Sequence, residues 1–138
     1  MDRSELLSVL VADDHADLTL LYSITINRAP GMRCVGAIHS AARLLHEVEA
    51  KHPDVVLLDL CMPGPPPLES MSEVLSRHPD VCFIVISGYD DSECRIQALQ
   101  AGARGFITKG NTPAFVIEAI RSAALLESSA TLPPRSAH

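Results

Sequence analysis

The sequence predicts an α/β fold in which helices cover a parallel β-sheet, and three observations lead to this prediction. Short runs of consecutive apolar residues recur along the chain, and such runs are typical of strands buried on both faces of a parallel sheet. Segments with apolar residues at helical spacing alternate with these runs, which indicates repeated β-α units. The length of 138 residues suits one domain with its own hydrophobic core.

Five strands are predicted, and four of them stop at polar side chains. These four are 9–12 before Asp13 and Asp14, 55–58 before Asp59, 81–86 before Ser87, and 105–108 before Lys109. A weaker apolar run predicts one more strand at 33–37. Because ligands bind parallel sheets at the carboxyl ends of the strands, these polar side chains are expected at one edge.

Five helices are predicted to follow these strands. In order, they are 15–29 before Pro30, a helix capped by Ser40 and ended by His52-Pro53, a helix marked by Leu68, Met71 and Val74, a helix carrying Ile96 and Leu99 and ended by Gly102, and a last helix begun by Thr112-Pro113. The prolines at 65–67 fix φ and remove N–H donors, so the third helix is expected to start late or to be placed unusually.

Composition and charge exclude several classes of function. The formal net charge is −6 with scattered Lys and Arg residues, which disfavours direct nucleic-acid binding by this chain. No apolar run approaches the ~18 residues of a membrane span, so no membrane contact is expected. The four cysteines show no C-x-x-C spacing, and we expect a reducing, cytoplasmic environment. Residues 1–126 are expected to form the domain and the Ser- and Pro-containing segment 127–138 a flexible tail or linker.

Three carboxylates, one hydroxyl and one ammonium are thus predicted to meet at one edge of the sheet. A single aspartate at a strand end is usually a turn or helix-cap residue. The combination instead indicates a site for a phosphoryl group and a divalent cation, because carboxylate oxygens suit Mg²⁺ while the ammonium and hydroxyl suit phosphoryl oxygens. The sequence therefore points to phosphoryl transfer.

The same residues resemble a known family. Asp13-Asp14, the segment DLCMPG at 59–64, Ser87-Gly88-Tyr89 and Phe106-Ile107-Thr108-Lys109 are similar to the signature set of the CheY-like receiver domain of two-component response regulators. The similarity covers residues 5–126, and it is greatest to receivers of NarL/LuxR-type transcriptional regulators. The resemblance implies a flavodoxin-like, doubly wound fold with strand order 2-1-3-4-5, flanked by five helices.

The resemblance also implies a role for each residue of the site. Asp59 is expected to be the nucleophile that becomes an acyl phosphate, while Lys109 and the Ser87 hydroxyl bind the other phosphoryl oxygens. The ligands expected for Mg²⁺ are Asp13, Asp14, Asp59 and the backbone carbonyl of Cys61.

Three further positions receive roles from the resemblance. Ser87 and Phe106 are implied as a switch pair, although the strand pattern by itself makes Phe106 a core residue. Cys61 and Tyr89, two residues beyond Asp59 and Ser87, are implied to tune hydrolysis of the phosphoaspartate. The six histidines show no ligand spacing with the cysteines, so they are expected to be solvated or to cap helices.

The resemblance implies a phosphorylation-activated switch that accepts a phosphoryl group from a sensor histidine kinase. It would signal through the face formed by the last two helices and the last strand, with a homodimer on phosphorylation and an output domain that controls transcription. It would catalyse only its own phosphorylation and dephosphorylation.

Three alternatives remain open: a stand-alone single-domain response regulator, an aspartyl-nucleophile phosphohydrolase, and an unphosphorylated pseudo-receiver. A phosphohydrolase would carry an acidic residue where this chain has Cys61, which argues against that alternative. A pseudo-receiver would be favoured if one of the acids or Lys109 were missing.

Overall fold

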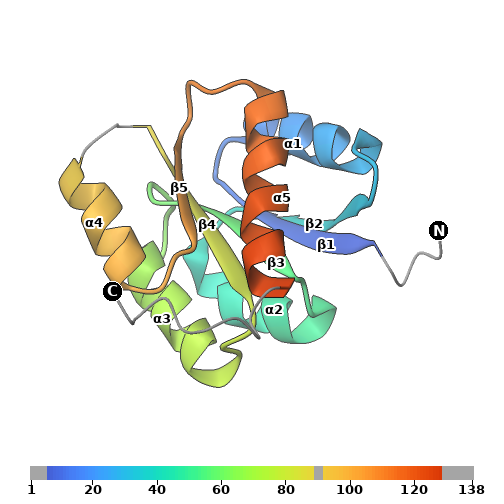
Figure 1. The fold of residues 1–138 in the computed structure, drawn as a ribbon. Helices are drawn as coiled ribbons and strands as arrows, with labels where there is room; N and C mark the ends of the chain where they lie inside the picture. Colours follow the sequence, from blue (N-terminus) through green and yellow to red (C-terminus); the bar gives the residue numbers. More distant parts are fainter. Residues whose placement is uncertain (1–5, 89–91, 129–138) are drawn as a thin grey trace.

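The computed structural model describes residues 6–88 and 92–128, which form a five-stranded parallel sheet between two layers of helices (Figure 1). The strands are β1 (Leu7–Ala12), β2 (Met32–Ile38), β3 (Val55–Asp59), β4 (Cys82–Ser87) and β5 (Gly105–Thr108). The helices are α1 (Ala16–Arg28), a short 3₁₀ helix η2 (Ala41–Arg43), α2 (Leu44–Lys51), α3 (Pro67–Arg77), α4 (Ser92–Gln100) and α5 (Pro113–Ser128). The strand order β2-β1-β3-β4-β5 confirms the order implied by the resemblance.

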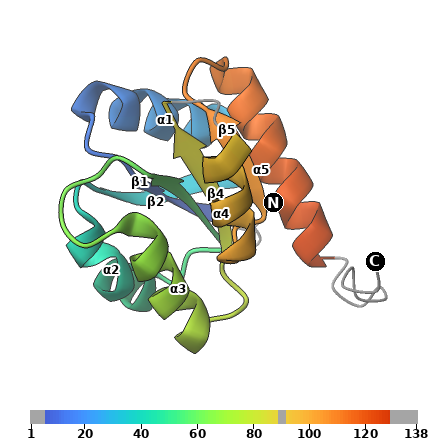
Figure 2. The ribbon, with the colours of Figure 1, turned by 90° about the vertical axis from the view of Figure 1, so that its left-hand side faces the viewer.

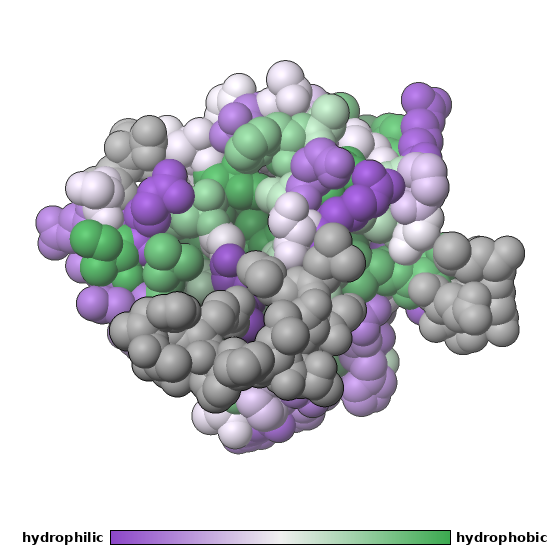
Figure 3. All heavy atoms as spheres, viewed as in Figure 1, coloured by the Kyte–Doolittle hydropathy of each residue, from purple (hydrophilic) through white to green (hydrophobic). Residues whose placement is uncertain are grey.

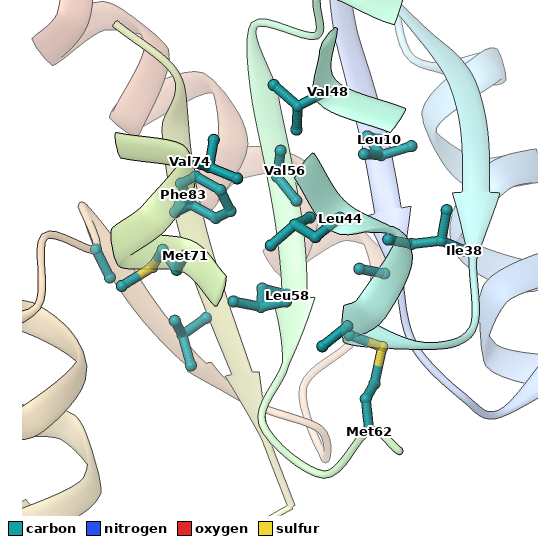
Figure 4. Packing of buried hydrophobic residues seen from close by; sticks show 14 of the residues in the cluster. Leu10, Ile38, Leu44, Val48, Val56, Leu58, Met62, Met71, Val74 and Phe83 are labelled. Atoms are coloured by element: carbon teal, nitrogen blue, oxygen red, sulfur yellow. The ribbon is translucent and has the colours of Figure 1, made fainter. Parts of the chain in front are cut away.

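Successive residues of each strand point to opposite faces of the sheet, and each face packs against its own helices. On one face α1 and α5 cover the strands with side chains such as Tyr22 and Ile120. On the other face α2, α3 and α4 contribute Leu44, Met71 and Ala98 (Figures 2 and 4). The central strand β3 is buried along its whole length, so the residue at its carboxyl end has a fixed position.

The helix boundaries agree with the sequence signals at three places and differ at one. The left-handed His52, at φ 49°, ends α2, and Gly102, at φ 117°, follows α4. Pro67 is the first residue of α3, which suits a proline because the first helical position needs no N–H donor. Ser40 Oγ accepts a hydrogen bond from the Ala42 N–H at 3.2 Å, but the turn that it caps is η2 rather than the α-helix.

Two sequence-based expectations concern the limits of the domain. None of the helices within residues 6–88 and 92–128 combines the length and the apolar character that a membrane span requires. Helix α5 extends to Ser128, and residues 129–138 lie outside the described part of the chain. The division into a domain at 1–126 and a tail at 127–138 therefore stays a prediction.

Candidate functional site

Two buried aspartates lie side by side at the carboxyl edge of the sheet. Asp13 directly follows β1, Asp59 is the last residue of β3, and these two strands are hydrogen-bonded neighbours. Asp13 is 1% exposed and Asp59 is fully buried, whereas Asp14 lies at the surface. Burial of a carboxylate is costly unless the charge finds partners. The fold therefore places two buried carboxyl groups at this edge, although the packing of the hydrophobic core does not require them.

Lys109 supplies the positive charge that these carboxylates share. Its Nζ lies 3.1 Å from Asp59 Oδ2 and 3.4 Å from Asp13 Oδ2. Its backbone N–H donates to the Ser87 carbonyl at 2.8 Å, which holds the residue beside β4. Burial lowers the pKa of Lys109, but the hydrogen bond and charge of Asp59, together with the charge of Asp13, more than offset burial and leave the pKa above its usual value. The side chain is therefore an ammonium at neutral pH.

Among the described residues, the Asp59 carboxylate receives one hydrogen bond on each oxygen. The Cys61 N–H donates to Oδ1 at 3.0 Å, and the Lys109 ammonium donates to Oδ2 at 3.1 Å. A carboxylate oxygen can accept about two hydrogen bonds, so each oxygen keeps acceptor capacity. The carboxylate is thus held in one orientation while lone pairs remain available for a ligand or for bond formation.

Asp13 is less completely satisfied than Asp59. Its Oδ1 accepts a hydrogen bond from the His15 N–H at 2.9 Å. Its Oδ2 is buried and makes no hydrogen bond with any residue that the structure describes, although the Lys109 ammonium lies 3.4 Å away. A buried acceptor without a hydrogen bond costs free energy and calls for an explanation, of which an ion is one.

The donor set around this oxygen fits a divalent cation. Asp13, Asp14, His15 and Asp59 each offer one ligand atom, and these atoms all lie within 4.8 Å of one another. Three of the four are carboxylates, the ligand type that Mg²⁺ prefers. Three of the residues expected to hold Mg²⁺, namely Asp13, Asp14 and Asp59, are therefore brought together, and their carboxylates fit the ion.

Two histidines border this pocket, and the sequence patterns did not place either of them there. His15 Nδ1 lies 3.1 Å from Asp13 Oδ1, and His39 Nδ1 lies 2.9 Å from the Asp13 carbonyl oxygen. His15 is exposed and occupies the N-cap position of α1 but makes no side-chain cap hydrogen bond. Its position directly after Asp13-Asp14 was the available sequence signal, whereas His39 comes from a separate loop.

Ser87 and Phe106 occupy the strands beside the aspartates. Ser87 ends β4 and is 2% exposed. Phe106 on β5 is also buried and belongs to the core cluster under α2, α3 and α4, as the strand pattern predicts. The guanidinium carbon of Arg95, on α4, lies 4.8 Å from the centroid of the Phe106 ring. This cation–π contact joins α4 to β5 and was not predicted.

The loop after Asp59 is hydrogen-bonded to the segment that begins η2. The Pro63 carbonyl accepts hydrogen bonds from the Ala41 N–H at 3.1 Å and from Ser40 Oγ at 3.2 Å. Gly64 has a φ of +98°, and a Cβ there would meet Ser40 Oγ at 2.7 Å. Only glycine suits this position, because both the backbone angle and the close approach exclude a side chain.

Of the two residues expected to tune hydrolysis of the phosphoaspartate, Cys61 belongs to the described part of the structure and Tyr89 does not. Cys61 is exposed and follows Asp59 by two residues, with its N–H bonded to that carboxylate. Tyr89 lies outside the described residues. Both roles, and the metal-ligand role of the Cys61 carbonyl, stay predictions.

The carboxylates of the pocket also affect the pKa of Tyr22, a core residue on α1. Burial raises the pKa of Tyr22 above its usual value, and Asp13 raises it further. Lys109 lowers this pKa by a smaller amount, and Asp59 adds a last increase. The electrostatic influence of the carboxylates thus extends beyond the residues that they contact.

Comparisons with known proteins agree with this geometry. The family model of the response regulator receiver domain matches residues 9–121. The response regulator GacA of Pseudomonas syringae pv. syringae is 34% identical over 116 residues, which cover 84% of this chain and 54% of GacA. The oxygen regulatory protein NreC of Staphylococcus carnosus is 30% identical over 117 residues, which cover 84% of this chain and 54% of NreC. The chain spans about half the length of these relatives.

A solved structure of a receiver domain is similar to this chain in both fold and sequence. The signal receiver domain of the response regulator NarL from Mycobacterium tuberculosis superimposes with a TM-score of 0.82 and is 31% identical. The superposition covers 87% of this chain and 97% of that one. The chain belongs to the family of response regulator receiver domains of two-component systems.

Proposed function

We propose that this receiver domain is a phosphorylation-activated switch in which Asp59 accepts a phosphoryl group from the phosphohistidine of a sensor histidine kinase. The observation that supports the proposal most directly is the state of the Asp59 carboxylate. It is fully buried at the end of the central strand, yet among the described residues only one N–H and one ammonium donate hydrogen bonds to it. A buried carboxylate with spare lone pairs and a neighbouring cation suits nucleophilic attack on phosphorus.

Mg²⁺ is the cofactor that we propose for this step. Asp13, Asp14 and Asp59 would hold the ion, with the Cys61 carbonyl as a further ligand. When bound, the ion neutralises part of the charge on the carboxylates and on the phosphoryl oxygens. The support for it is the buried Asp13 Oδ2, which lacks a hydrogen bond among the described residues.

The remaining residues position and neutralise the phosphoryl group. An Asp59 oxygen forms a bond to phosphorus as the bond between phosphorus and the kinase histidine breaks, which leaves an acyl phosphate. Lys109 donates to a phosphoryl oxygen, and the Ser87 hydroxyl binds another. Cys61 stands where a phosphohydrolase would need a general acid, and this weighs against turnover of external substrates.

We propose that the output surface is the face formed by α4, β5 and α5. Three large apolar side chains are exposed on the two helices, Ile96 (53%), Leu99 (46%) and Phe115 (51%). Figure 3 shows apolar spheres, in green, over α4 at the left of the view. Homodimerisation through this face on phosphorylation, and control of transcription by an output domain outside this chain, complete the proposal.

The test is phosphorylation by acetyl phosphate with Mg²⁺, followed by intact-mass spectrometry. The wild-type chain should gain one phosphoryl group, and Asp59→Asn should gain none. Asp54→Asn is the matched control, because Asp54 directly precedes the same strand at its opposite end. A phosphoryl group on the Asp59→Asn variant would refute the assignment.

A further inference from the structure

Helix α1 exposes large apolar side chains on the face that it turns away from the sheet. Its inner face buries Tyr22 and Ile26 in the core. On its outer face Leu20, Leu21 and Ile24 are 60%, 44% and 43% exposed. Residues three and four apart on a helix are neighbours, so these three side chains form one patch. The outer face of a surface helix is usually polar, and a contiguous apolar patch there points to a docking surface.

The exposed face follows the spacing of a coiled-coil seam. Asp17, Leu21, Ile24 and Arg28 are all exposed, and they recur at the alternating intervals of a heptad pattern. Asp17 lies in the first turn of α1 and Arg28 in the last. The seam therefore carries an acid at one end, a base at the other end and apolar side chains between them.

This seam is complementary to a second copy of itself. When two α1 helices pack antiparallel about the middle of the seam, Leu21 of each copy faces Ile24 of the other. The same register places Asp17 of each copy opposite Arg28 of the other. Every contact then occurs twice, as a two-fold symmetric interface requires. A parallel pair would instead bring like charges together at both ends, which is unfavourable.

Two further observations favour this arrangement. Within residues 6–88 and 92–128, neither Asp17 nor Arg28 makes an ion pair, so both charges can pair across an interface. A groove of about 370 Å³ between α1 and α5 adjoins the patch, and Thr25, Arg28 and Ile117 contribute to its lining. The antiparallel register places Leu20 of the second copy opposite Thr25, at this groove.

We propose that α1 is a homodimer interface, in which the seams of two chains pack antiparallel before any phosphorylation. The occupant of the patch is thus a second copy of this chain. The surface differs from the face of α4, β5 and α5 proposed above for the phosphorylated state, and it does not depend on chemistry at Asp59. One pair of short helices forms a small interface, so the dimer dissociates reversibly.

The experiment measures the dissociation constant of the unphosphorylated chain by sedimentation velocity over a range of concentrations. Asp17→Arg and Arg28→Asp each place like charges opposite one another, and each should weaken the dimer by about tenfold. An equimolar mixture of the two variants pairs opposite charges at both ends. This mixture should therefore regain the wild-type dissociation constant, a result that a change within a single helix does not produce.

A matched pair of substitutions locates the interface. Leu21→Gln on α1 should abolish the dimer, whereas Ile96→Gln, at a comparably exposed residue on α4, should leave it unchanged. Circular dichroism confirms that each variant is folded. A wild-type chain that stays monomeric up to about 1 mM overturns the inference and assigns the patch to a different protein. A mixture of the charge-reversed variants that stays monomeric, or a dimer that only Ile96→Gln dissociates, also overturns it.

Discussion

The two edges of the β-sheet use aspartate in opposite ways. At the amino edge, Asp54 Oδ2 accepts hydrogen bonds from the Ser8 N–H at 2.9 Å and from Ser8 Oγ at 3.0 Å. The Asp54 N–H donates back to Ser8 Oγ at 3.0 Å, so this pair ties β1 to β3. At the carboxyl edge, Asp59 and Asp13 are more buried, and Oδ2 of Asp13 makes no hydrogen bond with any residue that the structure describes.

This difference separates a structural aspartate from a reactive one. Asp54 is exposed, and its Oδ2 accepts two hydrogen bonds from Ser8. Asp13 is buried and keeps an oxygen without a hydrogen bond among the described residues. The two kinds differ in burial and in satisfaction together: Asp13 has a buried acceptor without a hydrogen bond among the described residues, whereas Asp54 is exposed. The predictions below test whether stability resides at one edge and chemistry at the other.

The largest effect is expected from Lys109→Ala. Loss of the ammonium removes the positive partner of the charge that develops on the phosphoryl group, which is worth about 2–4 kcal/mol at comparable sites. Phosphorylation by acetyl phosphate should therefore slow by roughly 30- to 1000-fold. Lys51→Ala is the control, because its ammonium pairs with Glu47 at 3.5 Å on α2. An unchanged phosphorylation rate for Lys109→Ala would contradict the proposed role of the carboxyl edge in phosphoryl transfer.

Asp54→Ala should show the reverse pattern. The substitution leaves the Ser8 side chain without its partner, and the free energy of unfolding should fall by about 1–3 kcal/mol. The phosphorylation rate should stay at the wild-type value. Urea unfolding and labelling kinetics measure the two quantities on the same sample, and a slower labelling rate without loss of stability would contradict the comparison.

Asp14→Ala should weaken Mg²⁺ binding by about tenfold, or ~1.4 kcal/mol, because it removes one carboxylate ligand. Asp14 lies at the surface, so its loss leaves no core cavity and the fold should persist. Mg²⁺ should raise the melting temperature of wild type more than that of this variant. Equal thermal shifts in the two proteins would count against Asp14 as a ligand.

The smallest effect concerns Tyr22 at alkaline pH. Burial and the neighbouring carboxylates raise its pKa above 10.0 in the folded state, so the ionised form is disfavoured there. Tyr22 therefore contributes stability below pH 10, and this contribution is lost as the pH rises through the folded-state pKa. An ultraviolet titration of a Tyr89→Phe variant isolates Tyr22. An apparent pKa at or below 10 would show that the charge of the pocket does not reach the core.

The sequence predicted the elements whose signal is local. The run before Asp59 is apolar at consecutive positions because β3 is buried on both faces, and the polar residue marks the point where the strand leaves the core. The same logic located Lys109 after β5. Strand β2 is the sheet edge and is only partly buried, so its run was weaker and its limits extended beyond the predicted 33–37 to Met32–Ile38.

The contacts that the sequence did not predict depend on distant segments. His39 reaches the carbonyl of Asp13 from the end of another strand, and Arg95 on α4 covers a ring on β5. No spacing within either segment indicates these pairs, since the sheet order alone brings them together. His15 differs, because it directly follows two aspartates of the pocket, yet without a cysteine at ligand spacing it was expected to be solvated or to cap a helix.

The hydrogen bonds that hold the loop after Asp59 reduce the conformational entropy lost when a ligand binds. The Pro63 carbonyl is bonded to Ala41 and Ser40, and Gly64 fits against Ser40 without space for a side chain. The segment between Asp59 and this attachment is therefore ordered before any ion or phosphoryl group arrives. Ordering a backbone residue costs about 1–2 kcal/mol, and here that cost is met during folding rather than during binding.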